Sequence, residues 1–272
     1  MKKLIYLMFL ACLFSCLNPH IGFGDDILNA DFVVVDNPIE EEPEEEEEVI
    51  IEPVFDCSQT VFLKSQAEVD AFGLEGCPEV ENLWIEEIDG PIFNLHKLTS
   101  LVKINGFLSI QDTSISDFEG LQNVTQLNGS LLIEHNPELF VVFGLQNITR
   151  LTELSIINNE GLTSIFSLNG LTSLRNLTIR ENNALTELEG LQNLKSVEQH
   201  ILIQENNFLS NIYDLDNIIN ANNISIMGND RLTDFCPLKN LLQSTNFTGD
   251  FITNFNGYNP TYEDVVTGNC SL

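Results

Sequence analysis

The sequence predicts a mainly β fold in which short parallel strands stack into a solenoid. Three observations lead to this prediction: a repeat of about 23 residues, an alternation of apolar and variable positions within each repeat, and a pair of cysteines on either side of the repeats. The chain has 272 residues, of which 43% are hydrophobic, so it can form a substantial core.

The chain begins with a segment typical of export. Lys2 and Lys3 precede an apolar run over residues 4–14 that is too short to span a bilayer. Residues 13–16, with the sequence LFSC, resemble the lipobox of bacterial lipoproteins. This resemblance implies that residues 1–15 are a signal peptide and that the thiol of Cys16 carries a lipid, which holds the protein at the outer membrane or cell surface. Phe14 departs from the lipobox pattern, so the alternative is a plain signal peptide and a secreted or periplasmic protein.

Residues 16–56 are predicted to form a disordered tether. Fourteen acidic side chains fall within residues 17–56, and eight of them are glutamates within residues 40–48. Because like charges repel, such a block stays extended and spaces the folded body from the membrane. Weak binding of calcium or of a cationic polymer by these glutamates is the alternative.

The charge balance excludes one class of partner. The formal net charge is -30, from 41 acidic and 11 basic residues, and residues 57–272 keep 27 acidic against nine basic residues. Nucleic acid and anionic lipid would meet a repulsive surface. We therefore expect no nucleic-acid partner, and membrane contact only through the lipid anchor.

Each repeat contains a predicted strand. Two aliphatic residues flank one variable position, and the second aliphatic is an isoleucine that recurs at spacings of 25, 23, 23, 23, 24 and 23 residues. Such alternation indicates a strand with one buried face. The recurring isoleucines are Ile85, Ile110, Ile133, Ile156, Ile179, Ile203 and Ile226.

Polar and glycine columns accompany the strands. The isoleucine is followed three or so residues later by a column of asparagines, whose amides can hydrogen-bond the backbones of neighbouring turns. The asparagines are Asn136, Asn159, Asn182, Asn206 and Asn229. Later in the repeat a glycine before a leucine permits a turn that other residues avoid. These glycines are Gly120, Gly144, Gly170 and Gly190, their places being taken by Asp214 and Pro237 in the last two repeats. A second polar column follows at Asn123, Asn147, Ser173, Asn193, Asn217 and Asn240.

A stack of such turns must be closed at both ends, because terminal strands expose unpaired edges. We expect an N-terminal cap over residues 57–82, with a short helix that buries Val69, Phe72 and Leu74, and a C-terminal cap over residues 232–272. Seven or eight turns at about 4.8 Å each give a rod of roughly 35 to 40 Å.

The four cysteines outside the signal segment are expected to staple these caps. Four cysteines allow three pairings, and their positions before and after the repeats favour the local pairs Cys57 with Cys77 and Cys236 with Cys270. A metal site is the alternative, but there is no C-x-x-C spacing and the four histidines are scattered along the chain. We expect neither a metal nor any other cofactor.

Together, the strand, the asparagine column, the glycine–leucine turn and the cysteine-bearing caps resemble the receptor L-domain type of leucine-rich β-helix. Bacterial surface lipoproteins with the same repeat are similar, and their end cap resembles LTDFCPLKNLL followed by YNPTYEDVVTGNC. The resemblance covers about residues 57–270 and implies a right-handed parallel β-helix with a recognition role. Ordinary leucine-rich repeats with long outer helices are the alternative architecture.

Two rows of residues are expected to face solvent on the strands. We define the middle row, between the two aliphatics, as Ser109, Leu132, Ser155, Thr178, Leu202 and Ser225, and the late row, after the isoleucine, as Gln111, Glu134, Ile157, Arg180, Gln204 and Met227. Apolar residues on such a face are typical of partner surfaces. The candidate partner-binding residues are Leu132, Ile157, Arg180, Leu202, Gln204 and Met227, and the ligand is expected to be a protein or a glycan.

No catalytic residue is predicted. Some right-handed β-helices cleave polysaccharides with clustered carboxylates and a basic residue, which makes such an enzyme the rival hypothesis. Carboxylates and an arginine do fall on or beside the strand face, but their positions form no cluster around a base; they are Asp112, Glu134, Arg180, Glu181 and Glu205. The motifs of serine hydrolases, zinc proteases, P-loops and EF-hands are absent from the sequence. A non-catalytic recognition or adhesion module is therefore the favoured function, and a purely structural envelope protein is a further alternative.

Overall fold

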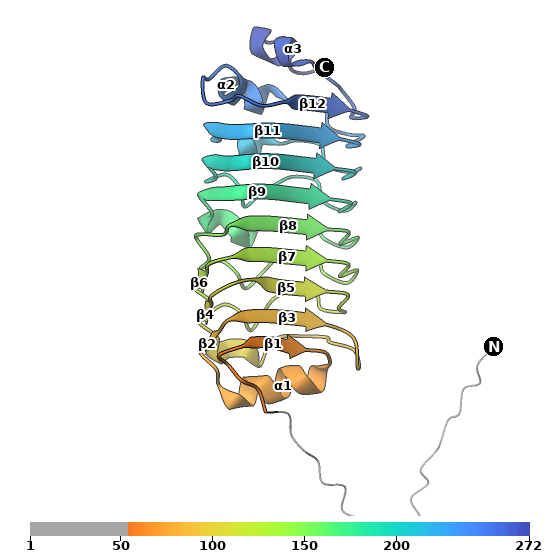
Figure 1. Ribbon diagram of the computed structural model, residues 1–272. Helices are drawn as coiled ribbons and strands as arrows, with labels where there is room; N and C mark the ends of the chain where they lie inside the picture. Colours follow the sequence, from red (N-terminus) through yellow and green to blue (C-terminus); the bar gives the residue numbers. More distant parts are fainter. Residues whose placement is uncertain (1–53) are drawn as a thin grey trace, which may run out of the picture. The chain divides into compact units, whose positions relative to one another are not determined.

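The computed structural model describes residues 54–272, which form a mainly β body (Figure 1). Its main sheet has nine strands in the order β1-β3-β5-β7-β8-β9-β10-β11-β12, and every neighbouring pair is parallel. The spatial order follows the chain order, so each strand lies beside the next one along the sequence. Such a sheet is consistent with a solenoid. The predicted signal peptide, the lipidation of Cys16 and nearly all of the predicted tether lie outside the described residues.

The predicted strands are present with the predicted register. The strands that carry the isoleucine column are β3 (Asn82–Glu86), β5 (Leu108–Gln111), β7 (Ser130–Glu134), β8 (Glu153–Ile157), β9 (Ser173–Arg180), β10 (Ser196–Gln204) and β11 (Asn220–Met227). Each isoleucine pairs directly with the isoleucine of the next strand, from Ile85 with Ile110 to Ile203 with Ile226. All seven are buried. The period of the sequence therefore fixes how the strands pair.

Two strands extend the sheet beyond the seven carried by the isoleucines. β1 (Thr60–Leu63) pairs with β3 and places Leu63 beside Ile85, and β12 (Phe251–Asn254) pairs with β11 and places Thr253 beside Ile226. Both strands lie in segments that were predicted to be caps. Neither strand fits the repeat template: Leu63 takes the place of the isoleucine in β1, and Phe251 and Thr253 occupy both inward positions in β12.

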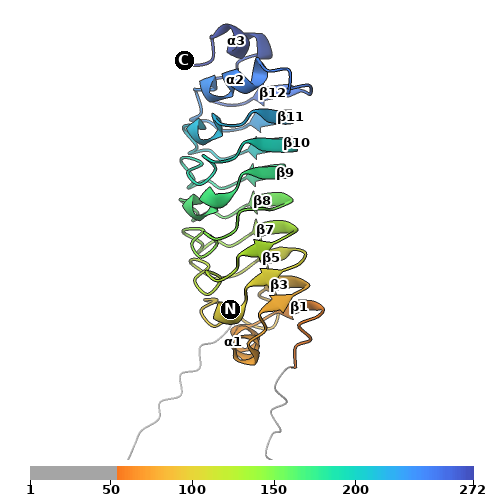
Figure 2. The same ribbon diagram turned by 90° about the vertical axis from the view of Figure 1, so that its left-hand side faces the viewer.

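The rest of each turn is short and irregular. A second parallel sheet contains only β2 (Glu79–Val80), β4 (Lys103–Ile104) and β6 (Gln126–Leu127). Four 3-10 segments occur at η1 (Leu98–Ser100), η2 (Phe166–Gly170), η3 (Tyr213–Leu215) and η4 (Cys236–Leu238). Seen at 90° in Figure 2, the main sheet forms one side of the body and these segments the other. Within residues 54–272 no α-helix lies between β3 and β11, so the alternative with long outer helices does not hold there.

The asparagine column forms a buried ladder at the ends of the strands. The side-chain oxygen of Asn159 accepts the backbone N–H of Asn136 at 3.0 Å and its side-chain amide at 3.1 Å. The amide of Asn159 donates to the carbonyl oxygens of Ile133 and Ile157 at 3.1 and 3.0 Å. The same bonds recur from Asn136 to Asn229, and Asn256 continues them past the predicted end of the column. The ladder thus joins each turn to the next.

The glycine column forms turns, with one exception. Gly120, Gly144 and Gly190 have φ of 115°, 111° and 119°, a conformation that L side chains rarely adopt. A side chain on Gly144 would also overlap the carbonyl oxygen of Phe118. Gly170 is different, because it lies in η2 and its φ is not positive. The expectation that all four glycines are needed for a positive φ was therefore wrong at Gly170.

Helices and disulfides close both ends. α1 (Gln66–Glu75) begins at Ser65, whose hydroxyl accepts the N–H of Glu68, and it buries Val69 and Phe72. Leu74 is 82% exposed, so its expected burial was wrong; the helix has only a narrow inward face. Phe55, which was assigned to the tether, packs edge-on against Phe72 at 5.4 Å.

The two local disulfides favoured by the sequence are both present, Cys57–Cys77 and Cys236–Cys270. The second disulfide joins η4 to the C-terminal segment that follows α3 (Tyr262–Thr267). Helix α3 packs beside α2 (Lys239–Leu242). Thr261 and Asp264 cap the start of α3 reciprocally. Each end of the sheet is therefore fixed by a helix and a covalent bond.

Candidate functional site

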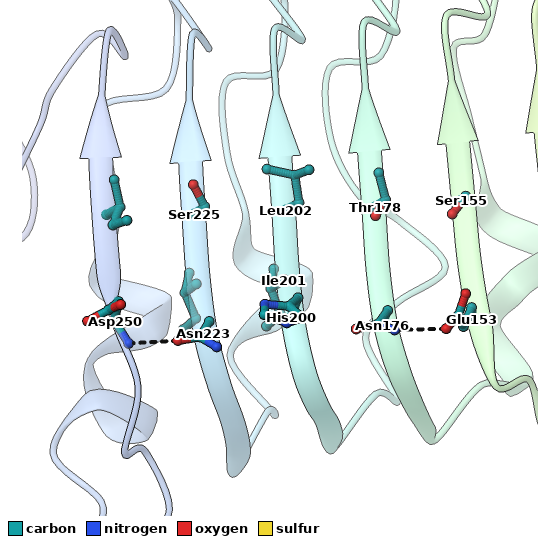
Figure 3. A pocket seen from close by; sticks show the side chains of 12 residues that line it. Glu153, Ser155, Asn176, Thr178, His200, Ile201, Leu202, Asn223, Ser225 and Asp250 are labelled. Atoms are coloured by element: carbon teal, nitrogen blue, oxygen red, sulfur yellow. Dashed lines mark hydrogen bonds between the residues drawn. The ribbon is translucent and has the colours of Figure 1, made fainter.

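The outer face of the main sheet carries a hollow that spans β8 to β12 (Figure 3). Its volume is about 590 Å³. We call it the sheet hollow and define it by the residues that line it: Glu153, Ser155, Asn176, Thr178, His200, Ile201, Leu202, Asn223, Ile224, Ser225, Asp250 and Ile252. Ile201 and Ile224 are core residues, and the other ten are at least partly exposed.

One side of the sheet hollow is a row of polar residues, each of which comes directly before the first of the two inward residues of the repeat. We call this the polar row: Glu153, Asn176, His200, Asn223 and Asp250, one from each successive strand or its entrance. A carboxylate stands at each end, an amide comes next on both sides, and the imidazole is central. No two neighbours in this row are of the same type, in contrast to the asparagine ladder.

The polar row is only partly bonded internally. The amide of Asn176 donates to Oε1 of Glu153 at 2.9 Å, and the backbone N–H of Asp250 donates to Oδ1 of Asn223 at 3.0 Å. Oδ1 of Asn176 points toward His200 (Figure 3); it is shielded from solvent and has no hydrogen-bond partner among the described residues. The row thus retains an acceptor and several donors that its own contacts do not use.

A β-bulge in β10 lies directly beside the polar row. Val197 pairs with Leu174 on one side and Ala221 on the other, but His200 pairs with Asn176 and Asn223, so β10 has one more residue than each neighbour at this point. The extra residue is the cause of the single 24-residue spacing in the isoleucine column. Bulges commonly lie next to a site, and here the extra residue lies between Val197 and the exposed His200, which itself keeps the register of the polar row.

The middle row provides the other side of the sheet hollow. Ser155, Thr178, Leu202, Ser225 and Ile252 lie side by side on β8 to β12. The three hydroxyl side chains are short, which leaves room above them, whereas Leu202 and Ile252 provide apolar surface at two strands. Ile252 is 42% exposed.

The six predicted partner-binding residues all lie on the outer face, but they do not form one patch. Ile157, Arg180, Gln204 and Met227 are adjacent in the late row, and Leu132 and Leu202 lie in the middle row, separated by Ser155 and Thr178. Only Leu202 lines the sheet hollow. Nε of Arg180 is 3.1 Å from Oε1 of Glu181, so its charge is already paired. Their role in binding stays a prediction.

The polar row was not predicted from the sequence. The position before the first aliphatic has no shared residue type from repeat to repeat, so the repeat template does not mark it. Two signals were available: the change of polar residue at each of five successive repeats, and the single 24-residue spacing between Ile179 and Ile203.

The opposite end of the same face is aromatic. The rings of Phe62 and Trp84 stack with centroids 5.9 Å apart, and Trp84 meets Phe107 edge-on at 6.0 Å. Nε1 of Trp84 donates to Oε2 of Glu86 at 2.9 Å. Phe62 is still 49% exposed, whereas Ser109, which pairs with Trp84, is only 3% exposed. The outer face is therefore apolar at β1 to β5 and polar at β8 to β12.

Histidine and carboxylate side chains also meet at two places outside the hollow. Nδ1 of His135 is 4.0 Å from Oδ1 of Asp112 and 3.8 Å from Oε1 of Glu134. His96, Asp117 and Glu119 are scattered in sequence but place their ligand atoms within 4.8 Å of one another, and His96 Nε2 is 3.5 Å from Glu119 Oε2. All three lie at the surface, and nothing else at this place points to a cation, so the expected absence of a metal stays a prediction. At the N-terminal cap, Cys57 and Cys77 lie near Glu75, but the two cysteines are in a disulfide and offer no thiolate to a metal.

Comparisons with protein-family models, with curated proteins and with solved structures give no significant match. Within residues 54–272, no helix is both long enough and apolar enough to cross a bilayer. The function must therefore be argued from the geometry of the outer face.

Proposed function

We propose that this chain is a non-catalytic recognition module of the cell envelope that binds a protein or glycan through the outer face of its main sheet. The observation that carries the proposal is the sheet hollow. It is a concave, partly polar surface on strands β8 to β12 of the main sheet, so regular strands position the side chains that line it.

The distribution of hydrogen bonds supports this role. In the buried asparagine ladder, each internal side chain bonds the turns on both sides, so its capacity is consumed by the fold. In the polar row, by contrast, Asn176 and Asn223 each contact one neighbour in the row, and His200 is exposed. Polar groups that the fold does not need are available to a ligand.

The spacing of the carboxylates favours binding over hydrolysis in this hollow. Glu153 and Asp250 stand four strands apart, which is about 19 Å at about 4.8 Å per strand. Two carboxylates that cleave a glycosidic bond lie roughly 5 to 9.5 Å apart. This pair therefore cannot flank one bond, although both carboxylates can contact different parts of one extended ligand.

For the architecture and location, we propose a right-handed β-helix of the receptor L-domain type, exported by the signal peptide of residues 1–15 and anchored by lipid on Cys16. The two disulfides support an oxidising compartment. Metabolic labelling with palmitate checks the anchor: the natural chain is expected to incorporate the label and Cys16→Ala is expected not to. Equal labelling of both would place the lipid elsewhere.

The recognition role is tested with the full chain carrying Cys16→Ala, which releases it from the membrane. The probes are an immobilised glycan array and a detergent extract of the envelope. We expect specific binding that falls at least about tenfold in Leu202→Asp, because the charge enters the sheet hollow. Ile219→Asp is the control, since Ile219 is 60% exposed and lies outside the hollow. Binding to neither probe, or equal binding by both variants, would overturn the proposal.

A further inference from the structure

We propose that the sheet hollow binds an uncharged oligosaccharide that lies across the strands from β8 to β12. This inference rests on the proposed function and specifies its ligand. Three properties of the hollow carry it: the kinds of polar groups, the absence of positive charge, and the regular spacing of the strands.

The polar groups suit a ligand rich in hydroxyls. A sugar hydroxyl both donates and accepts, so it pairs best with groups that offer both functions or with carboxylates beside amides. The polar row alternates such groups, with the amides of Asn176 and Asn223 between the carboxylates of Glu153 and Asp250. The hydroxyls of Ser155, Thr178 and Ser225 face them from the middle row.

The charge of the hollow selects against acidic sugars. Its lining includes two carboxylates and neither lysine nor arginine. Arg175 directly precedes Asn176 in β9 but does not line the hollow, and Arg180 in the late row is paired with Glu181. A uronate, sulfate or phosphate group would approach two carboxylates with no lysine or arginine in the lining to compensate them, on a body with 27 acidic and nine basic residues. An uncharged saccharide avoids this penalty.

The side-chain types also favour a saccharide over a protein. Protein interfaces depend on a few large buried anchors, most often Trp, Tyr or Arg on either partner. The hollow lining has none of these residues and has only Leu202 and Ile252 as exposed aliphatics. Two separated aliphatic side chains can contact the C–H face of sugar rings, whereas they offer little to an apolar protein anchor.

The geometry suits an extended chain of sugar rings. Adjacent strands are about 4.8 Å apart, and each of the five strands presents one residue of the polar row and one of the middle row. A ligand lying across the strands would meet a polar group at each step. His200 lies at the centre of this path, between Asn176 and Asn223 (Figure 3).

The test uses the full chain with Cys16→Ala and a panel of neutral hexasaccharides: β-1,4-glucan, β-1,4-xylan, β-1,4-mannan and α-1,4-glucan. Oligogalacturonate serves as the acidic probe. Calorimetric titration is expected to detect binding of at least one neutral hexasaccharide and none of oligogalacturonate. Asn176→Ala combined with Asn223→Ala is expected to weaken that binding at least about tenfold, since two hydrogen-bonding groups are removed.

A matched control is Asn123→Ala combined with Asn193→Ala. These exposed asparagines each donate one bond to a backbone carbonyl, of Thr99 and Asn169, and lie outside the hollow. The control is expected to bind like the natural chain. If the test variant fails to fold, His200→Ala replaces it, because His200 is exposed and its side chain has no hydrogen bond or ion pair within residues 54–272.

The outcomes separate the two proposals. If no neutral hexasaccharide binds while Leu202→Asp still abolishes binding to another probe, the saccharide inference is overturned and the recognition role stands. Saccharide binding that survives both Asn176→Ala with Asn223→Ala and His200→Ala would also overturn it. If the natural chain binds nothing on either test, both proposals fail.

Discussion

The asparagine ladder and the polar row cross the same strands, yet they differ in almost every respect. The ladder repeats one residue type, lies buried, and bonds each turn to the next. The polar row changes residue at every strand, lies at the surface, and bonds its neighbours only in part. Both are columns with one residue per turn, so position in the repeat does not distinguish them; the degree of repetition does.

This difference separates residues that hold the fold from residues that are free to bind. In a solenoid, each turn contacts only the turns above and below it, so a position that bonds or packs against the next turn needs the same kind of residue in every repeat. A position that faces solvent has no such demand. A run of different polar residues at one outward position is therefore a better guide to a site than any of the regular columns.

The largest expected effect is on the ladder. Asn159→Ala removes the acceptor for two donors of Asn136 and the donor to the carbonyl of Ile133, all of them buried. Unsatisfied buried groups cost about 1 to 3 kcal/mol each, so we expect the free energy of unfolding to fall by on the order of 3 to 5 kcal/mol in urea titrations.

The control for that substitution lies in the second polar column. Asn147 is exposed and donates one bond to the carbonyl oxygen of Gln122 at 2.7 Å. Asn147→Ala is expected to lower the free energy of unfolding by about 1 kcal/mol or less. Equal losses for Asn147→Ala and Asn159→Ala would contradict the special role of the buried column.

A repeated glycine should be nearly as sensitive. Gly144→Ala forces an alanine into a positive φ and also makes it overlap the carbonyl oxygen of Phe118. Gly76→Ala has the positive φ, 71°, without any atom near the new side chain. We expect a loss of about 1 to 2 kcal/mol at Gly76 from backbone conformation alone and a clearly larger loss at Gly144. Thermal unfolding of both variants measures the difference, and a ranking in the other order would be inconsistent with close packing of the turns.

The bulge in β10 tests whether an irregular feature beside the polar row serves binding rather than stability. Deleting Gln199 restores a 23-residue spacing and removes the extra residue beside His200. Because the neighbouring strands lack this residue, we expect the free energy of unfolding to change by only about 1 kcal/mol. Saccharide binding is expected to be lost. A variant with clearly lower stability whose folded form binds the saccharide like the natural chain would show that the bulge serves the fold.

The smallest effect concerns an irregular residue that has no role in binding. Asp214 replaces the repeated glycine, and burial together with Glu187 and Glu189 raises its pKa above the ordinary 3.8. The folded state therefore binds this proton more tightly than the unfolded state, so the stability contribution of Asp214 improves as pH falls through the raised pKa. Asp214→Asn should raise the melting temperature at pH 7, and this advantage should disappear below about pH 3.8. A constant advantage at all pH values would exclude ionisation as the cause.

Much of the fold could be predicted because its determinants recur. The spacing of Ile110, Ile133 and Ile156 fixed both the strands and their register, and the cysteine positions favoured the observed disulfides. The end strands β1 and β12 were missed because a terminal turn departs from the repeat on the side that no further turn covers. Leu74 was misassigned because helical spacing alone does not say which side of a short capping helix meets the core.

The candidate site was less predictable for a physical reason. Leu132, Ile157 and Leu202 were chosen because outward apolar residues are conspicuous, but the shape of the face depends on side-chain size in three neighbouring rows at once. Short residues such as Ser155 and Ser225 create the hollow because their side chains fill little of the space above the sheet. The effect of one extra residue in β10 likewise depends on the strands paired with it on both sides.

The most direct measurement compares two asparagines six positions apart in the same turn, Asn176 in the polar row and Asn182 in the ladder. Urea unfolding and titration with the neutral hexasaccharides are carried out on Asn176→Ala and Asn182→Ala. We expect Asn182→Ala to lower the free energy of unfolding by on the order of 3 kcal/mol and to leave the affinity of the folded protein unchanged. Asn176→Ala is expected to lower stability by about 1 kcal/mol or less and to weaken binding. Equal losses of stability, or unchanged binding by Asn176→Ala, would contradict the division between a repeated column that holds the fold and a varied row that binds.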